Sequence, residues 1–213
     1  MNNKVYLFDF DGTLVDSMPY WMEKVMNILR ISKVEYPADI IKIITPLGDL
    51  GTAKYFKDVL GVPFSLDKMF DMMDAYALDK YANEIVLKQG VYECLKQMKE
   101  KGYSLNVLTA SPHKMLDPCL KRNGVWELFD HIWSCDDFST TKADPKIYTE
   151  AARRLGVEPG DVVFFDDNIG AIRTAQEAGL ITVGVYDPTG EDFAQELKAV
   201  ADRYILSFEE WQK

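Results

Sequence analysis

The sequence predicts a doubly wound α/β domain with a mainly parallel sheet and a helical insertion after its first strand. After residue 90, short apolar segments alternate with amphipathic segments of helical length. Strands joined by such helices form parallel sheets that are covered on both faces. Residues 16–87, which follow the first strand, carry only helical patterns. We therefore expect an α/β core domain of residues 1–15 and 88–213, and a helical domain of residues 16–87.

The first strand is the apolar, β-prone run of residues 5–8, and two carboxylates follow it. Side chains alternate along a strand, so Asp9 and Asp11 should point to the same side. Gly12 allows a sharp turn and a close approach to a ligand, and Thr13 offers a hydroxyl and an N–H group there. An anion can bind at this place only together with a cation. The alternative is a strand end whose Asp residues merely cap a turn.

The insertion should contain four apolar stripes at helical spacing, and Ser65 is placed to cap the last helix. The stripes are Met18, Trp21, Met22, Val25, Met26 and Leu29; Ile40, Ile41, Ile44 and Leu47; Tyr55, Phe56, Val59 and Leu60; and Leu66, Met69, Phe70, Met73, Tyr76, Ala77 and Tyr81. Their Met and aromatic residues are expected to form the small core of the insertion rather than a ligand pocket.

The part after Gly90 should alternate helices and strands. Helices are expected over residues 91–101, 113–123, 145–155, 169–178 and 189–201, and strands over residues 104–109, 131–134, 162–165, 181–185 and 204–206. Glycines follow the first four of these helices, as is common at helix ends. The last strand should lie at an edge of the sheet.

Ligands of such sheets bind beyond the carboxyl ends of the strands. The second strand ends there in Thr109, Ala110 and Ser111, a hydroxyl and N–H set that suits an anion, although it is also a common helix cap. The fourth is followed by Asp166 and Asp167. Carboxylates from two strand ends would repel each other, and a hard cation such as Mg²⁺ relieves that repulsion. Simple N-caps remain the alternative for this acidic pair.

Lys142 lies in the loop before the helix that starts at Pro145, and Lys146 is a nearby competitor. A single Lys in a loop is usually a solvated surface residue. Its place in the chain order makes Lys142 a candidate, because it stands between the Thr109 segment and the Asp166–Asp167 pair.

The run from Asp9 to Thr13, DFDGT, resembles the first signature of the haloacid dehalogenase-like (HAD) phosphohydrolase superfamily. The order carboxylate pair, Thr, Lys, carboxylate pair is similar to the order of that family's four signatures, over the whole core. Lys142-Ala143 stands where the family often has Lys-Pro. The insertion point after the first signature resembles the subfamily with a small α-helical cap, to which phosphoglycolate phosphatase and β-phosphoglucomutase belong.

The resemblance implies a catalytic role for each matching residue. It makes Asp9 the nucleophile, Asp11 the acid/base, and Thr109 and Lys142 the second and third signatures. It also implies Mg²⁺ held by Asp9, the Asp11 carbonyl, Asp167 and, beside it, Asp166. The implied activity is hydrolysis of a small phosphorylated metabolite through an aspartyl-phosphate, beneath a cap that closes over the site.

Two alternatives to a phosphatase stay open, a phosphomutase and a non-catalytic binding protein on the same scaffold. A mutase should need cationic groups in its cap to hold a second phosphate. This chain has Trp21 near the hinge and a run of residues 45–51 without Lys or Arg, and Lys54 is the nearest cation. We expect that run to be a turn between helices, and Tyr20, Trp21 and Asp49 to face the leaving group of the substrate.

Composition limits the partners. The chain has 213 residues, 47% of them hydrophobic, and a formal charge of −10, which makes nucleic acid or an anionic membrane an unfavourable partner. An apolar strand that begins within a few residues of the N-terminus leaves no room for a signal peptide, and no apolar run is long enough to span a bilayer. We expect a cytoplasmic monomer or weak homodimer. Its three cysteines should be reduced and near the core, and its histidines should begin a helix (His113) and a strand (His131).

Overall fold

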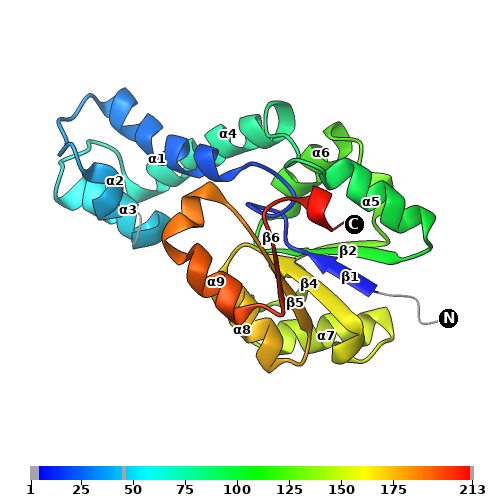
Figure 1. Ribbon diagram of the computed structural model, residues 1–213. Coiled ribbons are helices and arrows are strands. Elements are labelled where there is room, and N and C mark those ends of the chain that lie inside the picture. Colours follow the sequence, from blue (N-terminus) through cyan, green and yellow to red (C-terminus); the bar gives the residue numbers. More distant parts are fainter. Residues whose placement is uncertain (1–4, 45–46, 212–213) are drawn as a thin grey trace. The chain divides into compact units, whose positions relative to one another are not determined.

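The computed structural model describes residues 5–44 and 47–211. The chain divides into two compact units (Figure 1). We call Met1–Ser17 with Ile85–Lys213 the core unit and Met18–Glu84 the insert. Among the described residues, no helix is both long enough and apolar enough to cross a membrane.

The core unit is built on a six-stranded sheet in the order β3-β2-β1-β4-β5-β6, in which every neighbouring pair is parallel. The strands are β1 (Val5–Phe8), β2 (Ser104–Thr109), β3 (His131–Ser134), β4 (Val162–Asp166), β5 (Ile181–Val185) and β6 (Arg203–Ile205). The doubly wound parallel fold is thus confirmed, with β6 at an edge. The chain moves outward from β1 to β3 and then returns to β4 on the other side of β1, which creates a switch point between β1 and β4.

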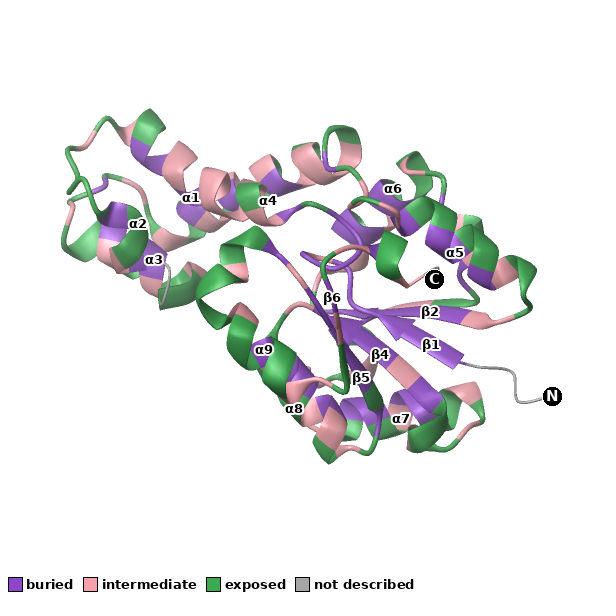
Figure 2. Ribbon diagram, in the orientation of Figure 1, coloured by how far each residue is buried: buried purple, intermediate pink, exposed green. Residues whose placement is uncertain are grey.

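Helices cover both faces of this sheet. Figure 1 shows α5 (Val91–Glu100) and α6 (His113–Arg122) on one face, and α7 (Lys146–Leu155), α8 (Ile169–Glu177) and α9 (Ala194–Val200) on the other. The connections also contain the short 3₁₀ helices η2 (Trp126–Leu128), η3 (Cys135–Phe138), η4 (Pro159–Asp161), η5 (Pro188–Phe193) and η6 (Phe208–Glu210). Because both faces are covered, every residue of β1 is buried, as Figure 2 shows. Phe8 of β1 stacks on Phe165 of β4 with ring centroids 4.8 Å apart.

The continuous helix expected over residues 189–201 is wrong in its first half, where the structure has η5 before α9 begins at Ala194. Asp187 caps η5, since its Oδ1 accepts hydrogen bonds from the N–H and the hydroxyl of Thr189 (2.9 and 2.6 Å). The N–H of Gly190 then bonds to the Asp187 carbonyl at 3.0 Å. This bond joins residues three apart, as in a 3₁₀ helix, and the hydrophobic pattern does not distinguish it from the four-residue spacing of an α-helix.

The insert contains α1 (Met18–Ser32), α2 (Ile40–Ile44), α3 (Gly48–Asp58) and α4 (Leu66–Asn83). Ser65 caps α4, since its hydroxyl accepts a hydrogen bond from the N–H of Lys68 at 3.1 Å. The buried core of the insert includes Phe56, Met69 and Met73. The expectation that these Met and aromatic residues pack on one another is confirmed.

The turn expected over residues 45–51 is wrong for the part that the structure describes. Thr45 and Pro46 lie outside the described residues, but α3 already begins at Gly48 and includes Asp49 and Gly51. Two glycines favour a turn locally, yet the helix carries Ala53 and Phe56 into the core of the insert. Tertiary packing therefore overrides the local preference.

The two linkers pair with each other inside the core unit. The N–H of Asp16 bonds to the Val86 carbonyl at 2.9 Å, and Val15 forms an antiparallel bridge with Leu87. Asp16, Ser17 and residues 85–87 consequently belong to the core unit, and the boundaries lie at residues 17/18 and 84/85 rather than at the expected 15/16 and 87/88.

Candidate active site

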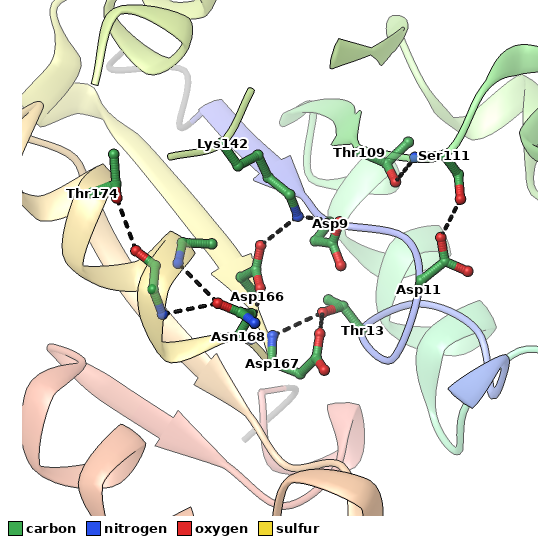
Figure 3. A network of polar contacts seen from close by, with 12 residues as sticks. Asp9, Asp11, Thr13, Thr109, Ser111, Lys142, Asp166, Asp167, Asn168 and Thr174 are labelled. Atoms are coloured by element: carbon green, nitrogen blue, oxygen red, sulfur yellow. Dashed lines mark hydrogen bonds and ion pairs between the residues drawn. The ribbon is translucent and has the colours of Figure 1, made fainter. Parts of the chain in front are cut away.

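The carboxyl ends of β1, β2 and β4 meet at one edge of the sheet. Phe8 at the end of β1 is in register with Phe165 of β4 and Val107 of β2. The N–H of Asp9 then bonds to the Phe165 carbonyl at 2.8 Å, which continues the ladder by one residue. This register brings polar side chains from three strands together at the switch point (Figure 3).

Three carboxylates form a cluster at this edge. Asp9, Asp166 and Asp167 each offer an oxygen, and these oxygens lie within 4.8 Å of one another. Asp9 and Asp166 are buried, so water screens their charges poorly. An arrangement of hard oxygen ligands at this spacing suits a divalent cation such as Mg²⁺.

Lys142 lies against two of these carboxylates. Its Nζ donates to Asp9 Oδ1 at 2.5 Å and to Asp166 Oδ2 at 2.7 Å, as Figure 3 shows. The hydroxyl of the buried Tyr148 bonds to the Lys142 carbonyl at 3.2 Å and holds the loop. Lys146, the competing candidate, lies exposed at the start of α7.

Burial or neighbouring charge raises the pKa of three groups at this edge, Asp9, Asp167 and Lys142. Burial raises the pKa of Asp9 well above its usual range, against the effect of Lys142, and the neighbouring carboxylates raise it further. Burial, followed by the charge of Asp166, raises the pKa of Asp167 to about 7. Burial disfavours the Lys142 ammonium, but the charges of Asp166 and Asp9 outweigh that cost and raise its pKa well above the usual value. One ammonium thus balances the three carboxylates incompletely, and the site favours additional positive charge.

Asp11 has a different partner from Asp9. Asp11 lies three residues beyond the end of β1 at Phe8. Its carboxylate accepts a hydrogen bond from the Ser111 hydroxyl at 2.5 Å (Figure 3). The N–H of Ser111 in turn donates to Thr109 Oγ1 at 3.0 Å. Ala110, between them, is exposed. The candidate acid/base is therefore held by the segment that follows β2, and its carboxylate is separate from the cluster of Asp9, Asp166 and Asp167.

Gly12 and Thr13 pack directly on Asp167. The Thr13 hydroxyl donates to Asp167 Oδ1 and accepts from the Asp167 N–H, both at 3.1 Å. Gly12 has a φ of +74°, and a Cβ at this position would lie 2.5 Å from Asp167 Oδ2. Only glycine allows this approach.

Tyr20, Trp21 and Asp49 all lie in the insert, the first two on α1 and the third in the first turn of α3. Asp49 Oδ2 accepts from Lys24 Nζ at 2.7 Å, and the same Nζ lies 5.5 Å from the centroid of the Trp21 ring. Lys24 therefore links two of the three candidates.

Sequence reasoning missed Lys88, whose Nζ donates to the carbonyls of Gly12 and Tyr186, both at 2.6 Å, and to Asp187 Oδ2 at 3.1 Å. Two of these acceptors are main-chain carbonyls, which leave no mark in the sequence. The expectations for cysteine and histidine are confirmed: the three cysteines are free and buried, His113 begins α6 and His131 begins β3.

Comparison with known proteins identifies the family. The family model for haloacid dehalogenase-like hydrolases matches residues 6–185. The chain is 30% identical to validoxylamine A 7'-phosphate phosphatase of Streptomyces hygroscopicus, over 85% of each sequence. It is 29% identical to pyrophosphatase PpaX of Bacillus velezensis, over 94% of this chain and 90% of that protein.

Solved structures agree with this assignment. A proposed β-phosphoglucomutase from Thermotoga maritima superposes with a TM-score of 0.84 at 25% identity, covering 97% of this chain and 95% of that one. The resemblance drawn from the DFDGT run and the order of the later motifs is thus confirmed, and this chain belongs to the haloacid dehalogenase-like hydrolases.

Proposed function

We propose that the protein is a Mg²⁺-dependent phosphatase that hydrolyses a small phosphomonoester through an aspartyl-phosphate on Asp9. Its family and relatives support a hydrolase that acts on phosphate esters. The observation that carries the proposal is the contact of Lys142 with Asp9 and Asp166, beside Asp167 within 4.8 Å. These contacts support Asp9 as the nucleophile, Lys142, from the loop before α7, as the cation beside it, and the three carboxylates as the metal-binding set.

Mg²⁺ fits the residues present. The buried cluster offers only carboxylate oxygens, its balance of charge favours a further cation, and Asp9, Asp166, Asp167 and the Asp11 carbonyl would hold the ion. When bound, Mg²⁺ would neutralise charge on the phosphate and on the carboxylates.

The residues of the chain then have separate tasks. Asp9 attacks phosphorus, and the bond from phosphorus to the ester oxygen breaks. Lys142 and Thr109 stabilise charge on the phosphoryl oxygens. Asp11 gives a proton to the leaving alcohol, and as a carboxylate it then takes one from the water that hydrolyses the aspartyl-phosphate. Gly12, Thr13, Ala110 and Ser111 supply the turns that accept the phosphate.

We propose that the insert acts as a cap that excludes water and selects substrates, with Tyr20, Trp21 and Asp49 as its selecting residues. The substrate would be a small phosphorylated metabolite, since the charge of −10 disfavours polyanions. A cytoplasmic monomer or weak homodimer, with neither nucleic acid nor membrane as a partner, completes the proposal.

A phosphomutase is the second candidate, favoured by the similarity to the Thermotoga maritima structure. Lys24, paired with Asp49, is a cation of the insert that could hold a second phosphate. Incubation with β-glucose 1-phosphate and a trace of glucose 1,6-bisphosphate separates the two candidates. A phosphatase releases inorganic phosphate, whereas conversion to glucose 6-phosphate without phosphate release would establish the mutase.

The proposal is tested by a phosphate-release screen with Mg²⁺ over sugar phosphates, phosphorylated organic acids, nucleotides and pyrophosphate. We expect Mg²⁺-dependent release from at least one phosphomonoester, abolished by excess chelator. Absence of release and of mutase activity over the whole panel would favour a binding protein on this scaffold.

A further inference from the structure

Lys88 is a mostly covered cation that the proposed chemistry does not use. Its side chain is 16% exposed and that of its partner Asp187 is 2% exposed. The Lys88 ammonium has three protons, and the structure gives it three acceptors, namely the Gly12 carbonyl, the Tyr186 carbonyl and Asp187 Oδ2. A lysine with all its donors used in this way is fixed in place, and it is not free to bind a phosphate.

The three acceptors come from two separate parts of the core unit. Gly12 belongs to the turn after β1, whereas Tyr186 and Asp187 follow β5. The main chain of Lys88 is bound as well, since its N–H donates to the Leu14 carbonyl at 2.9 Å. Lys88 directly follows the linker of residues 85–87. Its side chain and its main chain are bonded to the carbonyls of Gly12 and Leu14, which lie on either side of Thr13 in the turn.

That turn carries the groups that the proposed reaction needs. Asp11 directly precedes Gly12, and the Thr13 hydroxyl bonds to Asp167 on the other side. The N–H of Gly12 bonds to the Val15 carbonyl at 3.1 Å, so the turn is closed on itself. The two Thr13–Asp167 bonds hold the far side of the turn, so a shift of the Gly12 carbonyl would mainly move Asp11, the residue that precedes it.

We infer that Lys88 is a positioning residue, which holds the Gly12 carbonyl and thereby places the Asp11 carboxylate for proton transfer. The inference rests on the proposed function, because it assigns a purpose to Lys88 only if Asp11 protonates the leaving alcohol. Misplacement of a catalytic group by about 1 Å can cost about a hundredfold in rate.

Two substrates with different leaving groups test this role. Glycerol 2-phosphate releases an alkoxide that needs a proton, whereas p-nitrophenyl phosphate releases a stable phenolate that needs little help from an acid. Lys88→Met should lower kcat/KM for glycerol 2-phosphate by about ten- to a hundredfold and that for p-nitrophenyl phosphate by about threefold or less. The ratio of the two kcat/KM values does not depend on the fraction of the protein that is folded, because unfolded protein lowers both values equally.

Lys99→Met is the matched control, since Lys99 forms an ion pair with Asp130 in the core unit and both side chains are about one-third exposed. It should leave the ratio unchanged. Lys88→Arg keeps a positive charge opposite Asp187 but moves the N–H donors relative to the Gly12 carbonyl. The ratio of the two kcat/KM values in Lys88→Arg should therefore shift in the same direction as in Lys88→Met, but by a smaller factor. If Lys88→Met does not fold, a wild-type ratio in Lys88→Arg would overturn the inference.

Parallel losses for both substrates in a folded Lys88→Met protein would also overturn it, because a purely structural role lowers both equally. Wild-type protein that releases phosphate from no substrate of the panel above, with these two added to it, would instead overturn the proposed function, and this inference with it.

Discussion

At the scale of single residues, the site depends on close approaches between the turn after β1 and the end of β4. Gly12 permits the closest of them, because a Cβ there would lie 2.5 Å from Asp167 Oδ2 and the φ of +74° already disfavours a side chain. The backbone conformation alone costs an alanine about 1 kcal/mol or more. The contact with Asp167 adds a displacement of a candidate metal ligand.

Gly12→Ala should therefore lose stability and lose at least about a hundredfold in activity. Gly102→Ala is the control, since Gly102 has a φ of +76° but nothing within 4 Å of the added Cβ. Gly102→Ala should lose a similar amount of free energy of unfolding, because alanine is disfavoured at a positive φ, and should keep its activity. Urea unfolding and phosphate release measure the two effects, and equal activity in the two variants would refute the role given to Gly12.

His113 provides a test of charge at the residue scale. Its Nδ1 lies 2.8 Å from Asp117 Oδ1 and its Nε2 lies 2.9 Å from Asp137 Oδ2. The hydrogen bond to Asp117, helped by that to Asp137, raises the pKa of His113. A raised pKa in the folded state stabilises the protein below the ordinary pKa of about 6.5, and this contribution is lost as the pH rises through the folded value.

His113→Gln should accordingly cost more free energy of unfolding in mildly acidic buffer than in alkaline buffer. His131→Gln, which removes a ring stacked on Trp133, is the control for loss of an imidazole. A loss of unfolding free energy that is larger at high pH than at low pH would show that the protonated form of His113 does not stabilise the fold.

The sequence predicts part of the residue-scale site. Asp9, Asp166 and Thr109 could be placed together because the carboxyl ends of parallel strands meet at one edge. Lys142 could be preferred over Lys146 only from the order of the motifs. The Ser111–Asp11 bond and the Lys88 contacts could not be predicted, since they depend on side-chain conformations and on main-chain acceptors.

At the scale of elements, most of the core follows from local pattern. Strands β2, β3 and β5 have the predicted bounds, because each is a short apolar run between loop residues. The two errors have physical causes that lie outside the hydrophobic pattern. The segment before α9 closes a 3₁₀ turn on the Asp187 carbonyl, and packing of Phe56 extends α3 through two glycines.

Ser65 is the most direct test of an element boundary. Ser65→Ala removes the bond to the Lys68 N–H and should lower the free energy of unfolding of the insert by about 0.5–2 kcal/mol. Ser207→Ala is the control, because Ser207 precedes η6 without a side-chain capping bond. Equal effects in thermal or urea unfolding would show that the cap contributes nothing.

At the scale of the whole molecule, the chain has two units with separate cores. The helical stripes of residues 16–87 predict an insert, but its boundaries depend on pairing between linkers that lie 70 residues apart, such as Asp16 with Val86. The hydrophobic pattern of a short segment does not indicate which distant segment its main chain pairs with. We propose a division of tasks between the two units, with chemistry in the core unit and selection in the insert.

Trp21→Ala and Asp49→Ala should change the relative rates among substrates more than they change the requirement for Mg²⁺. Asp49→Ala also frees Lys24, which favours more anionic substrates. Asp71→Ala, a loss of an exposed charge on α4, is the control within the insert. An unchanged ranking in both variants would place selectivity elsewhere.

The proposed reaction depends above all on Asp9 as the nucleophile and on Mg²⁺. Asp9→Asn keeps the shape of the side chain, so its thermal unfolding should show an intact fold. The direct measurement is the rate of phosphate release by wild type and Asp9→Asn on the best substrate, with Mg²⁺ and in excess chelator. We expect a loss of several orders of magnitude in the variant, and a comparable loss of wild-type activity in chelator. Near wild-type release by Asp9→Asn, or by wild type in chelator, would contradict it.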